Sequence, residues 1–172
     1  MRMLDKLLQG VEVRSLVGDG TVAVGRLEFD SRKVVPGTLF FATRGTQADG
    51  HAYIPAAVAA GAAAVVCEEL PAERPAGVTF VQVPDSTVAL GQVASAFYGH
   101  PSRRLKLVGV TGTNGKTTTA TLLYRMFRKL GYKAGLISTV VYCVDDREIP
   151  STHTTPDSIR LNGMMAEMVE AG

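Results

Sequence analysis

Apolar residues fall into short runs of strand length in the first part of the chain. Gly25–Phe29 and Thr38–Ala42 are two such runs, and a turn containing Pro36-Gly37 separates them. Ala62–Cys67 and Val78–Val83 are nearly continuous apolar runs. Continuous apolar runs of this length are typical of strands that are buried on both faces. The pattern therefore predicts a small, largely buried sheet.

Helical spacing of apolar residues occurs between these runs. Tyr53–Ala60 carries small apolar residues at helical spacing, and Gly61 is placed to end that helix. A second helix is predicted from Pro84-Asp85-Ser86 to about Tyr98, with Asp85 or Ser86 as its N-cap. His100-Pro101-Ser102 would break this helix. We therefore predict an N-terminal α/β domain over residues 1–102.

The second part of the chain begins with a strand pattern that leads into a glycine-rich loop. Leu105–Val110 is mostly apolar, and a helix is predicted over Thr117–Leu130 with Gly131 as its stop. A further strand is predicted at Ala134–Ser138. This order of strand, loop, helix and strand predicts a parallel α/β sheet, of which about two parallel strands are present.

A hairpin and a last helix complete this part. Val140–Val144 and Arg147–Ile149 are expected to pair through a turn at Asp145-Asp146. The last helix is expected to run to about Glu170, with Thr155 as N-cap and Pro156 at its first position. Residues 103–172 are thus predicted to be the beginning of an α/β domain, cut short because nucleotide-binding sheets normally have more strands.

The loop between Val110 and the following helix carries the clearest chemistry. Its glycines allow the backbone to approach an anion, and the N-terminus of the helix adds a positive partial charge. Lys116 could reach the outer phosphates of a nucleotide, and the Thr117 hydroxyl lies where a P-loop places its magnesium ligand. We therefore predict a nucleotide phosphate site here.

The loop departs from the general P-loop pattern. That pattern has a glycine five residues before Gly115, where this chain has Val110, and the first loop glycine is Gly112. One alternative is that this segment is an ordinary glycine- and threonine-rich turn between a strand and a helix, with no ligand. A P-loop kinase or GTPase is another, although such proteins usually keep the stricter glycine spacing.

Composition excludes several classes of protein. With 46% hydrophobic and 20% charged residues, the chain is ordinary for a globular protein, and its net charge of +2 gives no reason to expect nucleic acid. Cys67 and Cys143 lack metal-type spacing and are expected to be reduced core residues. No signal peptide or membrane-spanning run is apparent, so we expect no membrane insertion and a cytoplasmic location.

Short polar motifs surround the loop in a distinctive order. Asp30-Ser31-Arg32 follows the first predicted strand, Gln47-Ala48-Asp49-Gly50 precedes the first helix, and Thr154-Thr155-Pro156 follows the hairpin. Each motif alone has an ordinary explanation as a turn or a helix cap. Together with Thr-Gly-Thr-Asn-Gly-Lys-Thr they resemble the Mur ligase family, and within it the branch that adds the third peptide residue. The resemblance extends from about Leu27 to the C-terminus.

This resemblance implies two substrate-binding regions. The N-terminal domain would hold the uridine end of UDP-N-acetylmuramoyl-dipeptide, and the muramoyl side would bind near the diphosphate. The first region would consist of Phe29, Ser31, Thr46, Gln47 and Ala48, and the second of Thr154 and Thr155.

The resemblance also implies the reaction, which is amide formation driven by ATP and Mg²⁺. Lys116 would act on the outer phosphates as the catalytic residue, Thr117 would contact the metal, and Thr118 would cap the helix and contact phosphate. The backbone cradle would be formed by Gly112, Thr113, Asn114 and Gly115. The amine would come from a diamino acid, either meso-diaminopimelate or L-lysine.

Several family features have no counterpart among these residues, namely later metal ligands, a carbamylated lysine and an amino-acid-binding domain. We therefore expect a monomeric N-terminal fragment that does not ligate by itself. Other Mur-type ligases, a folate polyglutamylating enzyme and a non-catalytic UDP-sugar-binding module stay open as alternatives.

Overall fold

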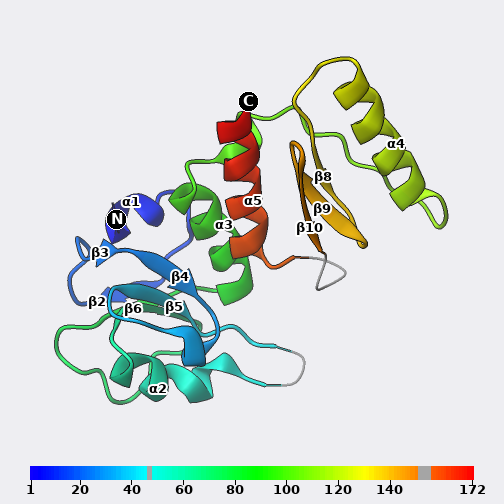
Figure 1. Ribbon diagram of the computed structural model, residues 1–172. Helices are drawn as coiled ribbons and strands as arrows, with labels where there is room; N and C mark the ends of the chain where they lie inside the picture. The colour runs from blue at the N-terminus through cyan, green and yellow to red at the C-terminus, as the bar shows by residue number, and fades with distance from the viewer. Residues whose placement is uncertain (46–47, 151–155) are drawn as a thin grey trace. The chain divides into compact units, whose positions relative to one another are not determined.

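The structure, a computed structural model, describes residues 1–45, 48–150 and 156–172 (Figure 1). The chain forms two compact units, Met1–Phe97 and Tyr98–Gly172, called here the N-terminal and C-terminal units. The division falls before Tyr98 rather than after residue 102. The reason lies in the C-terminal unit itself, where the Tyr98 ring lies against Gly163 and the turn at Pro101–Arg103 packs on the last helix.

The N-terminal unit is built on a five-stranded sheet in the order β2-β7-β6-β5-β4. Its four strands β4 to β7 are parallel neighbours, and β2 is antiparallel to β7 at one edge. The strands are β2 (Ser15–Val17), β4 (Arg26–Glu28), β5 (Thr38–Phe41), β6 (Ala62–Cys67) and β7 (Thr79–Gln82). The sequence predicted β4 to β7 within one or two residues.

Helices cover both faces of this sheet (Figure 1). Phe40, Val65 and Phe80 are in register across three strands and form one buried face, together with Ile54 and Ala57 of α2. The alternate residues of the same strands, such as Phe41 and Val66, are also fully buried and face the side where α3 packs. The continuous apolar runs of the sequence thus have the expected cause, which is burial on both faces.

Two helices of this unit, α2 and α3, begin and end within about two residues of the predicted signals, and the helix at Leu4–Leu7 was not predicted. The α-helices are α1 (Leu4–Leu7), α2 (Ile54–Ala59) and α3 (Ser86–Phe97), and the 3₁₀ turns are η1 (Ser31–Lys33) and η2 (Gly50–Tyr53). Asp85 caps α3 by accepting from the backbone N–H groups of Thr87 and Val88, both at 2.8 Å. Gly61 follows α2 with a φ of +94°, a conformation that favours glycine. A small ladder of β1 (Arg2–Met3) and β3 (Ala23–Val24) was not predicted.

The C-terminal unit contains a three-stranded sheet in the order β10-β9-β8. Its elements are η3 (Pro101–Arg103), α4 (Lys116–Lys129), β8 (Gly135–Ile137), β9 (Val141–Val144), β10 (Arg147–Pro150) and α5 (Ser158–Ala171). Both strand pairs are antiparallel, so the predicted parallel pair is wrong for the described part of this unit. The hairpin at Asp145-Asp146 is confirmed.

Two further predictions for this unit are wrong. Residues 105–110 form no strand, and Leu107 and Val108 are 61% and 72% exposed. A buried strand requires a hydrogen-bonded neighbour, and no described strand pairs with this run. Helix α5 begins at Ser158 rather than at Pro156. Its N-cap is Asp157, whose carboxylate accepts from the Arg160 backbone N–H at 2.8 Å.

No helix in the described ranges has the length and apolar character needed to cross a membrane. Cys67 and Cys143 are both buried free thiols, as predicted. Burial raises the pKa of the Cys67 thiol to about 11, so it packs as a small apolar residue rather than a reactive thiolate.

Candidate functional site

The predicted phosphate loop ends where helix α4 begins. Gly115 is the N-cap of α4 with a φ of +78°, and Gly112 has a φ of +145°. Both backbones lie in the region that favours glycine, so the two glycines shape the turn. No described side chain caps α4, and its first N–H groups are therefore open to a ligand. This is the geometry that attracts an anion to a helix N-terminus.

The Lys116 side chain bends back over this loop. Its ammonium group donates to the Gly112 carbonyl oxygen at 2.6 Å and to the Thr113 carbonyl oxygen at 3.2 Å. The positive charge therefore lies on the loop itself, within reach of any anion that the loop N–H groups bind. The loop residues from Gly112 to Lys116 are all exposed.

Thr117 has a hydroxyl partner that the sequence did not reveal. The Thr117 and Thr139 hydroxyl oxygens are 3.4 Å apart. Thr139 follows β8, so the end of a strand and the start of α4 place two hydroxyls side by side. The position of a threonine just after a predicted strand is the signal that could have pointed to it, since ligands bind at strand ends in α/β sheets.

The loop residues fit a phosphate group better than they fit a metal ion. The loop offers N–H groups, an ammonium group and hydroxyls, which are the donors that phosphate requires. No group of three or more His, Cys, Asp or Glu side chains in the described ranges could hold a metal. Magnesium in such sites usually takes one or two carboxylates together with substrate phosphates. Among the described contacts of this loop, the Thr117 and Thr139 hydroxyls are the side-chain oxygens that could serve it.

The predicted capping role of Thr118 is wrong. Thr118 lies inside the first turn of α4, and Gly115 occupies the N-cap position. The glycine is favoured there because the chain must turn with a positive φ at the point where the helix starts. Thr118 is exposed, and its predicted contact with phosphate stays a prediction.

An ionic cluster holds the other end of α4. Arg128 of α4 pairs with Asp145 and Asp146 at the hairpin turn, and Lys133 also pairs with Asp145. The Tyr124 hydroxyl donates to the Asp145 carbonyl oxygen at 2.7 Å. The hydrogen bond from Lys133 and the charge of Arg128 hold the pKa of Asp145 below its usual range. This cluster ties the helix that carries the phosphate loop to the hairpin.

The predicted uridine region of the N-terminal unit lies after β4. Phe29 directly follows this strand and is 39% exposed, and Ser31 is the first residue of η1. Arg32 forms two hydrogen bonds of 2.9 Å to the Asp30 carboxylate, which lower the pKa of Asp30. Asp30 also accepts from the Arg32 backbone N–H at 3.1 Å. The Asp30–Arg32 pair thus fixes the turn that presents Ser31.

The loop after β5 carries the third described residue of this region. Ala48 is exposed, and its carbonyl oxygen accepts from the Gly45 N–H at 3.0 Å. Because β4 and β5 are parallel neighbours, their carboxyl ends lie at the same edge of the sheet. Phe29 and Ser31 follow β4 at this edge, and the loop follows β5 there. Thr46, Gln47, Thr154 and Thr155 lie outside the described residues.

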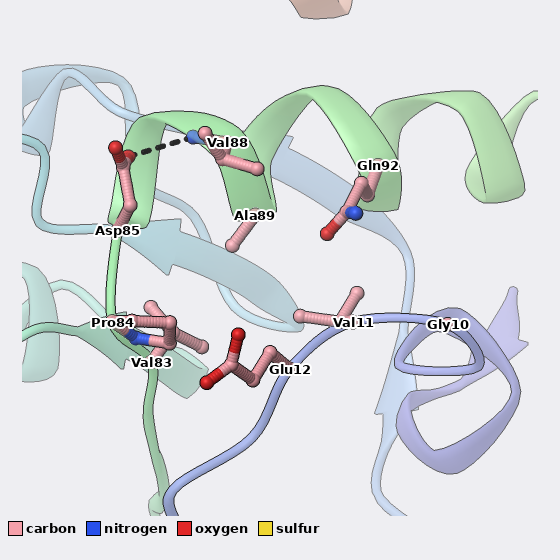
Figure 2. Close-up of a pocket in the computed structure, with 9 residues that line it drawn as sticks. All are labelled: Gly10, Val11, Glu12, Val83, Pro84, Asp85, Val88, Ala89 and Gln92. Carbon is pink, nitrogen blue, oxygen red and sulfur yellow. Dashed lines mark hydrogen bonds between the residues drawn. The ribbon is translucent and has the colours of Figure 1, made fainter.

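A separate cavity of about 260 Å³ lies beside the start of α3 (Figure 2). It is formed by two stretches of the chain, residues 10–12 and 83–92, and none of the predicted site residues lines it. Its lining consists of Gly10, Val11, Glu12, Val83, Pro84, Asp85, Val88, Ala89 and Gln92. The Asp85 carboxylate is already engaged in capping α3, and Glu12 is the other carboxylate of the lining.

Two family profiles each match one part of the chain. A family profile described as "Mur ligase family, catalytic domain" matches residues 24–98, and one described as "Mur ligase middle domain" matches residues 110–172. Two curated relatives are named UDP-N-acetylmuramoyl-L-alanyl-D-glutamate--2,6-diaminopimelate ligase. The one from Bacteroides thetaiotaomicron is 52% identical over 99% of this chain, and the one from Cytophaga hutchinsonii is 56% identical over 96%.

These matches cover 35% and 34% of the two relatives, so the chain spans about a third of their length. A solved structure with the same ligase name has a TM-score of 0.74 at 22% identity, over 100% of this chain and 34% of that one. MurF from Acinetobacter baumannii has a TM-score of 0.62 at 22% identity, over 96% of this chain and 32% of that one. At these identities the structures support the fold alone. The chain corresponds to an N-terminal part of these longer relatives. The two profiles and the relatives together show that this chain belongs to the Mur ligase family.

Proposed function

We propose that this chain forms the UDP-sugar-binding unit and the phosphate loop of an ATP-dependent ligase of peptidoglycan precursor synthesis. The ligase would add 2,6-diaminopimelate to UDP-N-acetylmuramoyl-L-alanyl-D-glutamate, which is the reaction in the names of the relatives. The proposal is carried by the position of the Lys116 ammonium group, which lies over a loop whose turns are made by glycines. The loop leads into α4, whose N-terminus has no side-chain cap. The two buried free thiols of the described residues support a reducing, cytoplasmic setting. We also propose that the protein is a monomer.

The loop residues would position the nucleotide for phosphoryl transfer. Backbone N–H groups from Gly112 to Gly115 would bind the outer phosphates of ATP, and Lys116 would exchange its two carbonyl partners for phosphate oxygens. Thr117, with Thr139 beside it, would hold magnesium through its hydroxyl, and the metal would neutralise phosphate charge.

The chemistry requires positioning more than acid–base groups. The terminal carboxylate of the dipeptide would take the γ-phosphoryl group of ATP, and ADP would leave. The amine of the diamino acid would then attack the acyl carbon, forming the amide bond and releasing inorganic phosphate. In the described residues, Phe29, Ser31 and the backbone at Ala48 would hold the uridine end of the substrate through apolar contact and hydrogen bonds.

Calorimetric titration of the chain tests both binding functions. We expect UDP-N-acetylmuramoyl-L-alanyl-D-glutamate and ATP each to bind. Lys116→Ala should weaken ATP binding about 10- to 100-fold, because it removes a charged hydrogen-bond donor, and should leave UDP-sugar binding unchanged. Binding of ATP without the UDP-sugar would contradict the proposal and favour another P-loop protein. Binding of the UDP-sugar without ATP would favour a non-catalytic module.

The isolated chain should bind without ligating. The described contacts to the phosphate loop come from hydroxyl and carbonyl groups, and no described carboxylate is bonded to it. We therefore expect no phosphate release above background when ATP, the UDP-dipeptide and diaminopimelate are added together. Sustained release of phosphate with formation of the tripeptide product would contradict this part of the proposal.

A further inference from the structure

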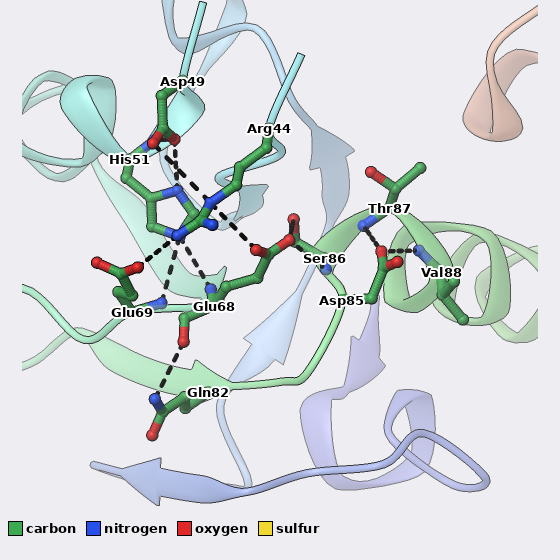
Figure 3. Close-up of polar contacts among 10 residues, drawn as sticks. All are labelled: Arg44, Asp49, His51, Glu68, Glu69, Gln82, Asp85, Ser86, Thr87 and Val88. Atoms are coloured by element: carbon green, nitrogen blue, oxygen red, sulfur yellow. Dashed lines mark hydrogen bonds and ion pairs between the residues drawn. The ribbon is translucent and has the colours of Figure 1, made fainter. Parts of the chain in front are cut away.

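Three segments of the N-terminal unit meet around His51 and Glu68 (Figure 3). They are the loop between β5 and η2, the residues that follow β6, and the first turn of α3. All three follow strands that end at the same edge of the parallel sheet. The polar contacts among them involve residues that the resemblance to Mur ligases did not single out for binding.

His51 connects two of these segments through both of its ring nitrogens. Its Nε2 accepts from the backbone N–H of Glu68 at 2.9 Å and from that of Glu69 at 3.3 Å. Because a backbone N–H can only donate, Nε2 carries no proton. The proton is then on Nδ1, which donates to the Asp49 carboxylate at 2.6 Å. The imidazole is thus a neutral bridge from the loop to the end of β6, and its side chain is only 14% exposed.

Asp49 and Arg44 close the base of the same loop. Asp49 accepts from the His51 backbone N–H at 2.9 Å, and this bond and the ring lower the pKa of Asp49. Arg44 forms a β-bridge with Asp49, and its guanidinium group pairs with Glu68 at 3.2 Å and with Glu69. Its charge is therefore engaged by the two carboxylates that follow β6.

Gly50 allows the two ends of the loop to approach each other closely. A Cβ at Gly50 would lie 2.6 Å from the Thr43 carbonyl oxygen and 2.7 Å from the Thr43 nitrogen, distances that no side chain tolerates. The Gly50 N–H also donates to the Thr43 carbonyl oxygen at 2.9 Å. The two ends of the loop are thereby held against each other.

Glu68 extends the bridge to α3. Its Oε1 accepts from the Ser86 backbone N–H at 3.1 Å and from the Ser86 hydroxyl at 2.9 Å. The Gln82 side chain donates to the Glu68 carbonyl oxygen at 3.0 Å. His51 therefore binds the backbone of Glu68, whose own side chain is held by Ser86 and by Arg44. The point at which the loop is attached to the end of β6 is thus rigid.

We propose that His51 is a positioning residue for the uridine end of the substrate, acting through the Nε2 bonds that hold the Arg44–Asp49 loop base at the end of β6. The inference rests on the proposed function, in which this loop presents Ala48 to the nucleotide. A loop whose base is fixed before the ligand arrives loses less conformational entropy on binding. The Nε2 bonds supply this hold across segments, whereas the Nδ1 bond to Asp49 is local to the loop.

Two substitutions separate the two ring nitrogens. In His51→Asn the amide NH₂ can replace Nδ1 and donate to Asp49, but the shorter side chain cannot reach Glu68. In His51→Gln the longer amide can place its oxygen near the Nε2 position and accept from the Glu68 N–H. We expect His51→Asn to weaken the binding of UDP about tenfold. We expect His51→Gln to recover most of that loss.

UDP affinity would be measured by calorimetry on the full chain, with ATP affinity as an internal control. Amide hydrogen exchange of β5, β6 and β7 would show whether the sheet core is intact. A fall in UDP affinity for His51→Asn with unchanged ATP affinity and unchanged core protection supports the inference. Equal UDP affinity in all three proteins overturns it, and so does a loss of UDP affinity that is matched by loss of core protection.

The wild-type protein separates this inference from the proposed function. If wild-type chain binds no UDP, the proposed function fails and the inference falls with it. If wild-type chain binds UDP but both His51 variants bind it equally well, only the inference fails. Asp49→Asn is the matched local variant, because the amide that it introduces keeps an oxygen that can accept from His51. It should weaken UDP binding less than His51→Asn does, and a larger effect would contradict the primary role of Nε2.

Discussion

The two units of this chain differ in how completely their apolar residues are covered. In the N-terminal unit, Phe40, Phe41 and Phe80 are fully buried in a sheet that has helices on both faces. In the C-terminal unit, α4 has no buried residue, and apolar residues such as Leu122 and Leu130 are 60% and 63% exposed. Apolar packing on both faces of the sheet therefore stabilises the first unit. In the second unit, the phosphate-loop helix is held by half-buried side chains such as Leu123 and Tyr124 together with ionic contacts at the hairpin.

The largest expected effect contrasts one aromatic residue from each unit. Phe40→Ala should lower the unfolding free energy of the N-terminal unit by about 3–5 kcal/mol, because it empties a buried site in a central strand. Phe127→Ala should cost only about 1 kcal/mol, since Phe127 is 40% exposed and its ring forms an edge-to-face pair with Tyr132. Residue-resolved amide exchange measures both losses. Similar losses at the two positions would contradict the contrast.

A second prediction concerns the ionic cluster at the hairpin. Asp145→Asn removes the charge but keeps the backbone, because Asn tolerates the φ of +51° found there. Amide exchange in α4 should become faster, and exchange in the N-terminal unit should not change.

Acid should have the same effect on wild-type protein. The folded pKa of Asp145 is lowered, so its stabilising contribution is complete above the ordinary Asp range of about pH 4 and is lost as the pH falls through the lowered value. The Asp145→Asn variant should lack this pH dependence in α4. An unchanged acid response in the variant would show that other groups cause it.

The smallest expected effect is at the Asp30–Arg32 pair. Arg32→Ala should change the unfolding free energy of the N-terminal unit by less than about 1 kcal/mol, because the Arg32 side chain is 85% exposed. The remaining effect should shrink further as salt is added. Urea titrations at low and high salt measure it. A loss as large as that of Phe40→Ala would mean that the Ser31 turn, rather than the sheet, limits the stability of this unit.

The sequence predicted the parts of the fold whose signals are local. The apolar runs that became β5 and β6 are long enough and continuous enough to be recognised directly, and glycine marked the end of α2 and the turn before α4. The glycine turn that leads into α4 was also predicted, because its glycines and Lys116 lie within one short segment. Its binding of phosphate stays a prediction.

What the sequence could not predict depends on contacts between distant segments. The run 105–110 has the composition of a strand, but strand conformation needs a neighbour, and the described residues supply none. The short strands β1 to β3 have too few residues to show periodicity. Asp49-Gly50 looked like an ordinary turn. The role of the adjacent His51 could not be predicted, because its bonds to Glu68 and Glu69 join residues 17 and 18 positions apart.

The most direct test of the central account is residue-resolved NMR of the chain during separate titrations with UDP and with ATP. UDP should shift the amide signals around Phe29, Ser31 and Ala48, and ATP should shift those from Gly112 to Thr118. Each ligand should leave the other region unperturbed. Perturbation of one common set of residues by both ligands, or of neither region by its predicted ligand, would contradict the account.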